Sequence, residues 1–242
     1  MSNGYARIAA WLRLPLGRAL LSVEAAAVRP VIEELFGLHV LQLGHWSEAD
    51  ELINSARAQH RAIIGCRSGG PAAMVCKPSQ TAIASDSVDA VLLPHTLELD
   101  PEPHDVLRET ERILIGEGSV VVIGFNPWSS FGVRRSLSNH RFPPGVRGFI
   151  SERRLCDWLR LLGFEIGGVQ RLFYRLPINS KGLLERTTGL ERVGASVWSR
   201  LGASYVVRAR KRVFAKVQIK RVKRLRRGVV PGLVEPTTRI SE

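Results

Sequence analysis

The clearest pattern of apolar and polar positions lies in the middle of the chain. Residues 88–93 and residues 120–123 form two short apolar runs without alternation, which is typical of strands covered on both faces. Between these runs apolar residues recur on one helical face. Asp100 is a suitable N-cap, Pro101 a suitable first helical residue and Gly116 a suitable stop. This order predicts a strand, a helix and a second strand, joined as a right-handed crossover between parallel neighbours.

The N-terminal region also has a helical pattern. Residues 1–38 are predicted to be helical, with one helix opened by Pro15, a second restarted by Pro30 and its end at Gly37. This arm could cap a cofactor or substrate pocket, or it could simply pack against the core. The apolar run of residues 39–43 follows it and predicts the first strand.

The first predicted strand leads into the turn Gly44-His45-Trp46-Ser47. Ser47 is a suitable N-cap for a helix that runs through Ile53. Free backbone N–H groups at such a turn can bind a nucleotide or another polar cofactor, although the turn can equally be a plain connection.

The rest of the chain alternates strand and helix patterns around turns rich in glycine and proline. Residues 61–65 and 72–76 are two further strand candidates, and the short segment between them leaves room only for an abridged or hairpin-like corner. Beyond the central unit a short helix is predicted at 129–137, followed by a loop at 139–148 that could act as a mobile flap. The remaining predicted elements are a helix capped by Ser151, a strand region at 164–174, a helix at 182–201 and a last strand at 204–209.

Length and composition indicate one domain with appendages. The chain has 242 residues, of which 45% are hydrophobic, and this is enough to bury a substantial core. Its three cysteines, Cys66, Cys76 and Cys156, have neither CxxC nor zinc-ligand spacing, which favours a reducing, cytoplasmic setting. No apolar run approaches the roughly 18 residues needed to span a bilayer, and the N-terminus lacks the pattern of an export signal.

The net charge of +13 is concentrated near the C-terminus. Residues 213–242 contain eight Lys and Arg residues against two Glu residues, so they carry about half of the excess positive charge. Such a tail can attract polyanions, either RNA through counterion release or anionic lipid through its surface potential. The alternative is a solvated, disordered tail without a fixed partner.

One run of residues in the central stretch has the order of a known family. Its members are Ser87-Val88-Asp89-Ala90-Val91, Leu97, Asp100-Pro101, Leu107-Arg108-Glu109, Arg112-Ile113-Leu114 and Gly116-Glu117-Gly118. This run resembles the class I S-adenosylmethionine-dependent methyltransferases, specifically the type 11 methyltransferase-domain branch. The resemblance covers residues 39–210 loosely. Together with the helical pattern of residues 1–38 and the charge of the C-terminus, it divides the chain into an N-terminal helical arm at residues 1–38, a methyltransferase-like α/β domain at residues 39–212 and a basic, disordered tail at residues 213–242.

The resemblance also implies a fold and a cofactor. The expected fold is a Rossmann-like α/β domain, with a seven-stranded, mostly parallel sheet, helices on both faces and an antiparallel last strand. The expected cofactor is S-adenosyl-L-methionine, bound at the carboxyl ends of the first strands. The positions that correspond to the family's cofactor contacts are Gly44, His45, Trp46, Cys66, Lys77, Pro94 and His95.

Several positions depart from the family's cofactor motifs. Gln42 stands where the family has an acid before its glycine loop, and His45 and Trp46 stand where it has successive glycines. Cys66 stands where an acid binds the ribose hydroxyls, and Lys77 where an Asp faces the adenine amino group. Charge-assisted hydrogen bonds contribute roughly 1.5–3 kcal/mol each, so these departures are expected to affect cofactor binding more than the fold.

Two residues are candidates for the chemistry. Methyl transfer from a sulfonium is an in-line displacement, for which the protein mainly supplies positioning and, for some acceptors, a base. His95 follows the fourth strand and is the candidate base, because imidazole titrates near neutral pH; the alternative is that it only hydrogen-bonds the turn. Asn126, after the fifth strand, could orient the acceptor or could form a turn with Pro127.

Two functions from different classes fit these observations. The first is a cytoplasmic methyltransferase that acts on a small molecule or an RNA. The second is a non-catalytic binding module, which keeps the methyltransferase scaffold and engages RNA, a membrane or a protein through its basic tail. Trp46 distinguishes them. An indole in the space of the methionine moiety favours the module, whereas an indole turned away from an open cleft beside His95 favours the enzyme.

Overall fold

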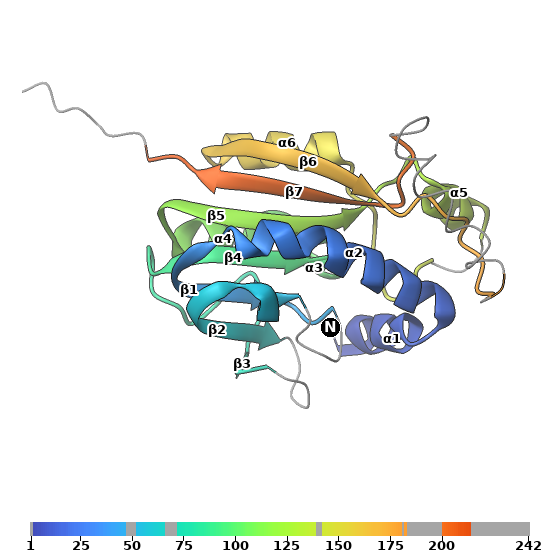
Figure 1. Cartoon of the computed structure of the whole chain (residues 1–242), viewed down its shortest axis with the longest axis horizontal. Coiled ribbons are helices and arrows are strands. Elements are labelled where there is room, and N and C mark those ends of the chain that lie inside the picture. The colour runs from blue at the N-terminus through green and yellow to red at the C-terminus, as the bar shows by residue number, and fades with distance from the viewer. Residues whose placement is uncertain are drawn as a thin grey trace, which may run out of the picture.

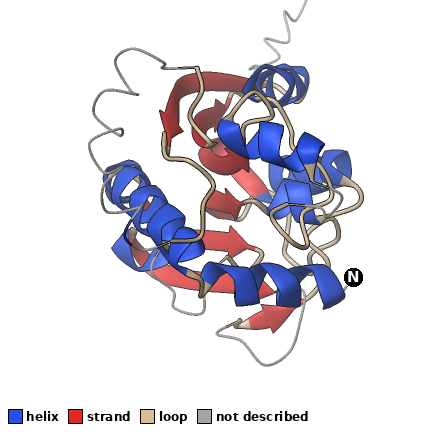
Figure 2. Ribbon diagram, turned by 90° about the vertical axis from the view of Figure 1, so that its right-hand side faces the viewer, coloured by secondary structure: helices blue, strands red, loops and turns tan. Residues whose placement is uncertain are grey.

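A seven-stranded sheet runs through the middle of the protein, with helices on both of its faces (Figures 1 and 2). The computed structural model describes residues 2–46, 52–65, 72–138, 142–180, 182 and 200–213. The strand order is β3-β2-β1-β4-β5-β7-β6. Strands β1 to β5 are parallel, and β7 is antiparallel to both of its neighbours, β5 and β6. The predicted fold class, a mostly parallel seven-stranded α/β sheet with an antiparallel last strand, is confirmed.

The elements have the following bounds. The strands are β1 (Phe36–Leu43), β2 (Arg57–Gly65), β3 (Met74–Val75), β4 (Val88–Pro94), β5 (Leu114–Phe125), β6 (Phe164–Leu172) and β7 (Ser204–Lys211). The helices are α1 (Ser2–Leu12), α2 (Pro15–Glu33), the 3-10 turn η1 (Ile53–Ser55), α3 (Thr96–Leu99), α4 (Pro103–Ile113), α5 (Ser130–Leu137) and α6 (Glu152–Leu161).

The central strand–helix–strand unit is confirmed, with different helix bounds. The parallel strands β4 and β5 are joined through α3 and α4. The prediction that the helix starts at Pro101 is wrong, because Pro103 occupies the first turn of α4. Asp100 instead ends α3, and its Oδ1 accepts a hydrogen bond from the Glu102 N–H at 2.9 Å. Gly116 lies within β5 and not at a helix stop, because β5 begins directly after α4.

The N-terminal arm contains two helices, but they are divided differently from the prediction. Helix α2 continues through Pro30, which lies in its last turn, so the predicted restart at this residue is wrong. Proline there removes one backbone donor and leaves the rest of the helix intact. The residues of α2 that repeat at every fourth position and are buried are Leu16, Leu20, Glu24, Val28 and Ile32. This stripe faces the sheet, and a carboxylate lies at its centre.

The corner between β2 and β3 is short, as predicted, but it is not a hairpin. Strand β3 is parallel to β2, with Ile64 paired to Met74 and Gly65 to Val75. The hairpin-like alternative is therefore wrong. The helix expected from Ser47 lies largely outside the described residues, and the described end of this connection is the 3-10 turn η1.

In the C-terminal half the predicted elements α5, α6, β6 and β7 are confirmed. The hydroxyl groups of Ser129 and Ser151 cap α5 and α6 by accepting backbone N–H groups of Gly132 and Arg154. The helix expected at residues 182–201 and the basic tail lie almost entirely outside the described residues. The action of residues 139–148 as a flap stays a prediction.

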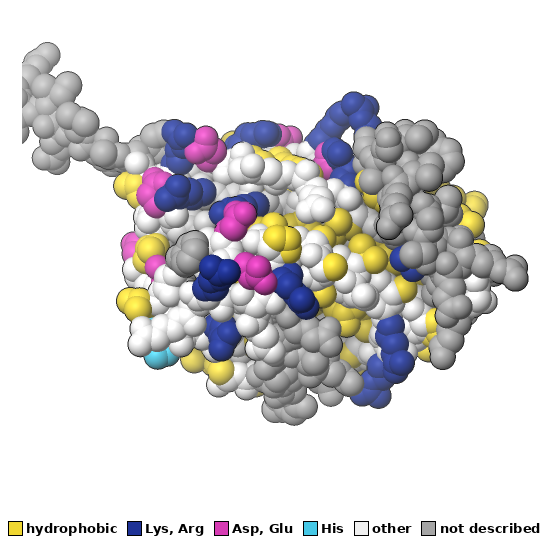
Figure 3. Space-filling view, viewed as in Figure 1, with side chains coloured by type: hydrophobic (Ala, Val, Ile, Leu, Met, Phe, Trp, Pro, Cys, Tyr) yellow, Lys and Arg dark blue, Asp and Glu magenta, His cyan; other side chains and the backbone are white. Residues whose placement is uncertain are grey.

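The apolar core has two parts, one on each face of the sheet. One part packs beneath α1, α2 and η1 and contains most of the large aromatic side chains, whereas the other packs beneath α4 and α6. Helix α2 crosses in front of the strands in Figure 1. In Figure 3, which has the same viewpoint, hydrophobic side chains gather near the centre of this face, and the Lys and Arg side chains drawn there are scattered around them.

Candidate functional site

The topology of the sheet places the candidate site at the carboxyl ends of β1 and β4. These two strands are neighbours, with Val40 paired to Ala90 and Gln42 to Leu92. The chain passes from β1 outward to β2 and β3 and then returns to β4 on the other side of β1. This is the switch point of the sheet, and open α/β sheets bind their ligands outside the carboxyl ends of the strands at such a point.

The turns that follow β1 and β4 both contain left-handed backbone and are tied together. Gly44 has φ +92° and His95 has φ 51°, which is uncommon for a residue other than glycine. The Thr96 hydroxyl donates to the Leu43 carbonyl. A Cβ on Gly44 would lie 2.7 Å from Thr96 Oγ1, so no larger residue fits at this turn without displacing Thr96.

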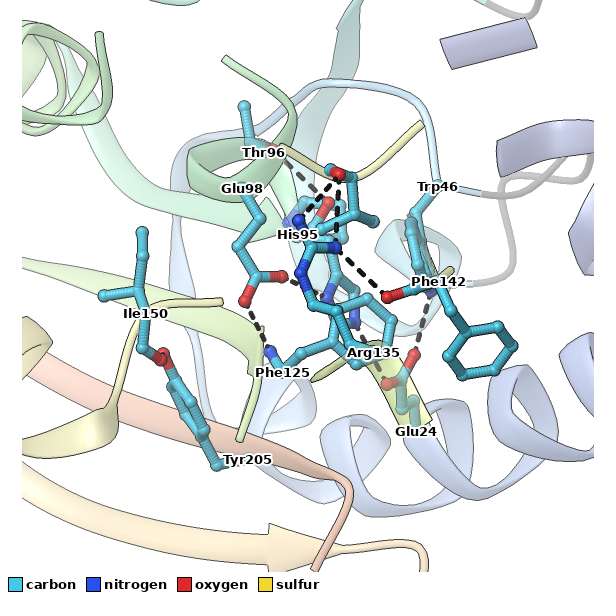
Figure 4. Close-up of polar contacts among 12 residues, drawn as sticks. Glu24, Trp46, His95, Thr96, Glu98, Phe125, Arg135, Phe142, Ile150 and Tyr205 are labelled. Carbon is cyan, nitrogen blue, oxygen red and sulfur yellow. Dashed lines mark hydrogen bonds and ion pairs between the residues drawn. The ribbon is translucent and has the colours of Figure 1, made fainter. Parts of the chain in front are cut away.

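A buried hydrogen-bonded network surrounds His95 (Figure 4). Its Nε2 lies 3.0 Å from Glu24 Oε1, and its Nδ1 lies 2.9 Å from Glu98 Oε2. The other oxygen of Glu24 accepts the Trp46 indole N–H at 2.8 Å. The other oxygen of Glu98 accepts the Phe125 backbone N–H at 2.7 Å. Every carboxylate oxygen and both ring nitrogens therefore have a partner, as buried polar groups require.

Aromatic rings enclose the same histidine. The Trp46 ring is stacked on His95, with centroids 3.9 Å apart and an interplanar angle of 28°. The Phe125 ring lies on the histidine at 4.1 Å. His95 and Glu24 are completely buried, and Trp46 is 1% exposed. Stacking of a protonated imidazole on an aromatic face is favourable, as for other cation–π pairs.

The network keeps His95 charged at neutral pH. Burial alone would lower the pKa of His95, but attraction and hydrogen bonding from Glu24 and Glu98 outweigh it and raise the pKa to about 9. Burial raises the pKa of the Glu98 carboxyl, although hydrogen bonds from His95 and from the Phe125 N–H oppose this change. The imidazole therefore donates both N–H groups, and it can take up a proton only after it has lost one. Its role as a base stays a prediction.

The other predicted cofactor positions lie at different distances from this network. Pro94 is the last residue of β4 and is buried. The His45 ring lies against Gly65 at the end of β2, where an added Cβ would lie 2.6 Å from His45 Nε2. Lys77 is exposed beyond the edge strand β3, in a bridge with Gln80. Cys66 lies outside the described residues.

Asn126 holds the turn after β5. Its Nδ2 donates to the carbonyls of Arg200 and Gly202, at 2.8 and 3.0 Å, and its Oδ1 accepts the Trp128 N–H at 3.0 Å. The side chain is thus engaged at both ends, and its residual exposure is 7%. This geometry accounts for Asn126 as a turn residue, and an interaction with an acceptor stays a prediction.

Sequence reasoning missed Glu24 and Glu98, which are the two carboxylates of the network. Glu98 follows His95 by three residues. Glu24 precedes His95 by 71 residues, but it carries a signal, because it is the single charged side chain in the fourfold repeat of α2. A charged residue in the middle of an apolar helical stripe is seldom buried without a partner.

The arrangement of β1 also leaves one polar atom without a partner. Gln42 is 4% exposed, and its Nε2 donates to the Gly44 carbonyl at 3.0 Å. Its Oε1 is buried and has no hydrogen-bond partner among the described residues. An unsatisfied buried acceptor at a strand end needs an explanation, and the binding of a ligand that donates to it is one.

The sequence has relatives among known proteins, although no protein-family model matches the chain. It is 34% identical over 174 residues to the uncharacterized protein YafS of Escherichia coli (strain K12), and the match covers 71% of this chain and 71% of YafS. The chain belongs to the YafS family. Another relative, the uncharacterized protein Rv2003c of Mycobacterium tuberculosis (strain ATCC 25618 / H37Rv), is 30% identical over 65% of this chain and 57% of its own length.

Solved structures show that this YafS-family chain has the fold of class I methyltransferases. A SAM dependent methyltransferase from Archaeoglobus fulgidus has a TM-score of 0.55 at 13% identity, covering 78% of this chain and 93% of that chain. Geranyl diphosphate C-methyltransferase from Streptomyces coelicolor A3(2), solved with Mg²⁺, geranyl diphosphate and S-adenosyl-L-homocysteine, has a TM-score of 0.53 at 15% identity, covering 78% and 77%. In the part of the chain that the structure describes, no helix is long and apolar enough to cross a membrane.

Proposed function

We propose that the protein is an S-adenosylmethionine-dependent methyltransferase of the type 11 branch, which acts in the cytoplasm on a small molecule or an RNA. One observation carries this proposal. The two left-handed turns at Gly44 and His95 meet at the switch point of a sheet with methyltransferase topology, which is where such sheets bind ligands.

The residues at the end of β1 fit one half of the cofactor. Gln42 Oε1 is a buried acceptor without a partner among the described residues. An amide oxygen can accept a hydrogen bond from the ammonium group of the methionine moiety. Gly44 supplies the left-handed backbone of this turn, and its missing side chain makes room for Thr96. Lys77 does not match the adenine amino group, since both are donors.

The chain's own residues then have distinct roles. The bound cofactor supplies a methyl group on a reactive sulfonium. Gln42 would hold the methionine end, and the buried His95 would lie beneath the reacting atoms as a fixed imidazolium. If the acceptor must lose a proton to His95, the rate of that step rises with pH as the pKa of about 9 is approached, because only the neutral ring accepts a proton.

Calorimetry with S-adenosyl-L-homocysteine tests the proposal directly. We expect binding with a Kd below about 1 mM, because the departures from the family motifs weaken binding without removing the site. Gln42→Leu should lower this affinity by about tenfold, which is the effect of losing one hydrogen bond to a charged group. Adenosine, which has no ammonium group, should bind equally to both proteins.

The control in this experiment is Glu33→Gln, a change on α2 outside the network. It should bind S-adenosyl-L-homocysteine like the wild-type protein. Absence of any binding heat at millimolar ligand, from protein that is shown to be folded by circular dichroism, would remove the methyltransferase proposal.

The second candidate is the non-catalytic binding module, and one observation favours it. The Trp46 indole turns inward onto His95, and both side chains are almost completely shielded from solvent. The criterion set from the sequence asks whether the indole occupies the space of the methionine moiety, and an indole turned inward beside His95 fits the module better than one turned away from an open cleft. Its ligand would be a polyanion such as RNA, or a membrane or protein surface, engaged through residues 213–242.

Truncation after Arg212 tests this second candidate. Full-length protein should retain RNA on a filter at about 50 mM salt and lose most of it at about 300 mM, because counterion release makes the affinity strongly dependent on salt. The truncated protein should retain little RNA at either concentration. Equal retention by the two proteins at low salt would contradict a role for the tail.

A further inference from the structure

Glu24 joins three parts of the chain that are distant in sequence. It lies on α2, and its two oxygens accept separate donors, the His95 Nε2–H after β4 and the Trp46 Nε1–H after β1. The carboxylate is completely buried. Figure 4 shows the indole and the imidazole converging on it from the end of the sheet. This carboxylate hydrogen-bonds the N-terminal arm to both side chains.

Helix packing alone does not account for a carboxylate at this position. Leu20 and Val28 flank Glu24 in the buried repeat of α2, so leucine here would complete an apolar stripe. Burying a carboxylate is unfavourable unless it is paired and hydrogen-bonded. A fully paired carboxylate at this point indicates that Glu24 serves to orient its partners, His95 and Trp46.

The other groups around His95 cannot replace Glu24. Glu98 lies on the same turn as the histidine, and its second oxygen is bound to the Phe125 N–H. Arg135, from α5, donates to backbone carbonyls of the segment that follows that helix. Tyr205, from β7, donates its hydroxyl to the Ile150 carbonyl at 2.7 Å.

We propose that Glu24 is a positioning residue of the candidate site, which holds the His95 ring and the Trp46 indole together beneath the place where the cofactor would bind. The N-terminal arm is then part of the site. The placing of a cofactor above the two rings rests on the proposed function, whereas the positioning of the rings by Glu24 does not depend on it.

The experiment compares Glu24→Gln with Glu33→Gln. Both changes remove one negative charge from α2, and glutamine is isosteric with glutamate, so Glu24→Gln has the better prospect of folding than Glu24→Ala. Circular dichroism establishes that each variant is folded. The wild-type protein and both variants are then followed by NMR and by calorimetry with S-adenosyl-L-homocysteine.

The first readout is the titration of His95, assigned by the loss of its signals in His95→Gln. In the wild-type protein and in Glu33→Gln, the ring should stay protonated through neutral pH, since the pKa of His95 is about 9. In Glu24→Gln, the pKa should fall by about 1–3 units, which is the effect of removing an adjacent opposite charge. A role in packing alone would not move this value.

The second readout is solvent exchange of the indole N–H groups. Trp46 is buried and bonded to Glu24, whereas Trp128 is 76% exposed and serves as an internal reference. Exchange at Trp46 should be much slower than at Trp128 in the wild-type protein, and it should accelerate by about tenfold or more in Glu24→Gln. Glu33→Gln should leave it unchanged.

The outcomes separate this inference from the proposed function. Unchanged His95 titration and unchanged Trp46 exchange in Glu24→Gln would overturn the positioning role. Changes in both, together with an affinity for S-adenosyl-L-homocysteine about tenfold lower than in Glu33→Gln, support both proposals. If the His95 titration and the Trp46 exchange both change but the wild-type protein does not bind S-adenosyl-L-homocysteine, the positioning role is supported and the methyltransferase proposal is contradicted.

Discussion

His95→Ala is expected to destabilise the protein by about 3–5 kcal/mol at pH 7, because it leaves two buried carboxylates without their shared cation. Glu24 is completely buried and Glu98 is 2% exposed, so bulk solvent does not hydrate either carboxylate. This loss of folding free energy is larger than that of most single substitutions, because it leaves buried charges unpaired.

The pH dependence of this variant should run in a fixed direction. Burial raises the folded-state pKa of the Glu98 carboxyl above its value in the unfolded chain, and His95→Ala removes the hydrogen bond and the charge of the imidazolium that oppose this change. A group whose pKa is raised on folding contributes stability at low pH, and this stability is lost as the pH rises through the folded value. The loss caused by His95→Ala should therefore be smaller at pH 5 than at pH 7.

The wild-type protein provides the comparison in the same experiment. The pKa of His95 is raised from 6.5 to about 9, so its contribution is fully present below pH 6.5 and disappears as the pH rises to about 9. This amounts to roughly 3 kcal/mol. The His95→Ala protein lacks this decline. Its destabilisation relative to the wild type should thus be greatest near neutral pH.

Urea unfolding at pH 5, 7 and 9 measures these differences. The control is His60→Ala, which removes an exposed histidine whose described ring contact is a stack on His39 at 5.1 Å. That change should stay within about 0.5 kcal/mol at each pH. Equal losses for His95→Ala at pH 5 and pH 7 would show that packing alone, and not charge pairing, accounts for the effect.

Local patterns in the sequence were sufficient to predict most of the sheet. The apolar runs of β4 and β5, and the serine cap at Ser151, depend on near neighbours in the chain. The antiparallel direction of β7 came from the family resemblance, because no short pattern specifies strand direction. The bounds at Pro30 and Pro103 were missed, since a proline is compatible with the last or the first turn of a helix.

The candidate site was less predictable than the sheet. The place of His95 at the end of β4 followed from the strand pattern, but its partners did not. Glu24 reaches the histidine only because α2 crosses the face of the sheet, and the direction in which Trp46 points depends on that carboxylate. Contacts between residues so distant in sequence are set by tertiary packing, which periodicity does not encode.

Trp46→Ala is the second change with a large expected effect. The indole is 1% exposed and stacks on His95, and Phe125 lies at a centroid distance of 6.0 Å. Truncating a buried tryptophan removes a large apolar contact area and leaves a cavity, so we expect a loss of about 3–5 kcal/mol. Trp128→Ala, at an exposed position, should change stability by less than about 0.5 kcal/mol.

The same variant separates the two candidate functions when S-adenosyl-L-homocysteine is added. If the indole is the floor of a cofactor site, the wild-type protein binds the ligand and Trp46→Ala binds it more weakly. If the indole occupies the space of the methionine moiety, the wild-type protein does not bind, and only the variant gains affinity. Trp46→Phe, which keeps an aromatic ring but removes the donor to Glu24, provides a folded protein for the measurement. A smaller ring should improve binding only where the indole obstructs the ligand. Tighter binding of S-adenosyl-L-homocysteine by Trp46→Phe than by the wild-type protein would therefore contradict a supporting position of the indole beneath the cofactor.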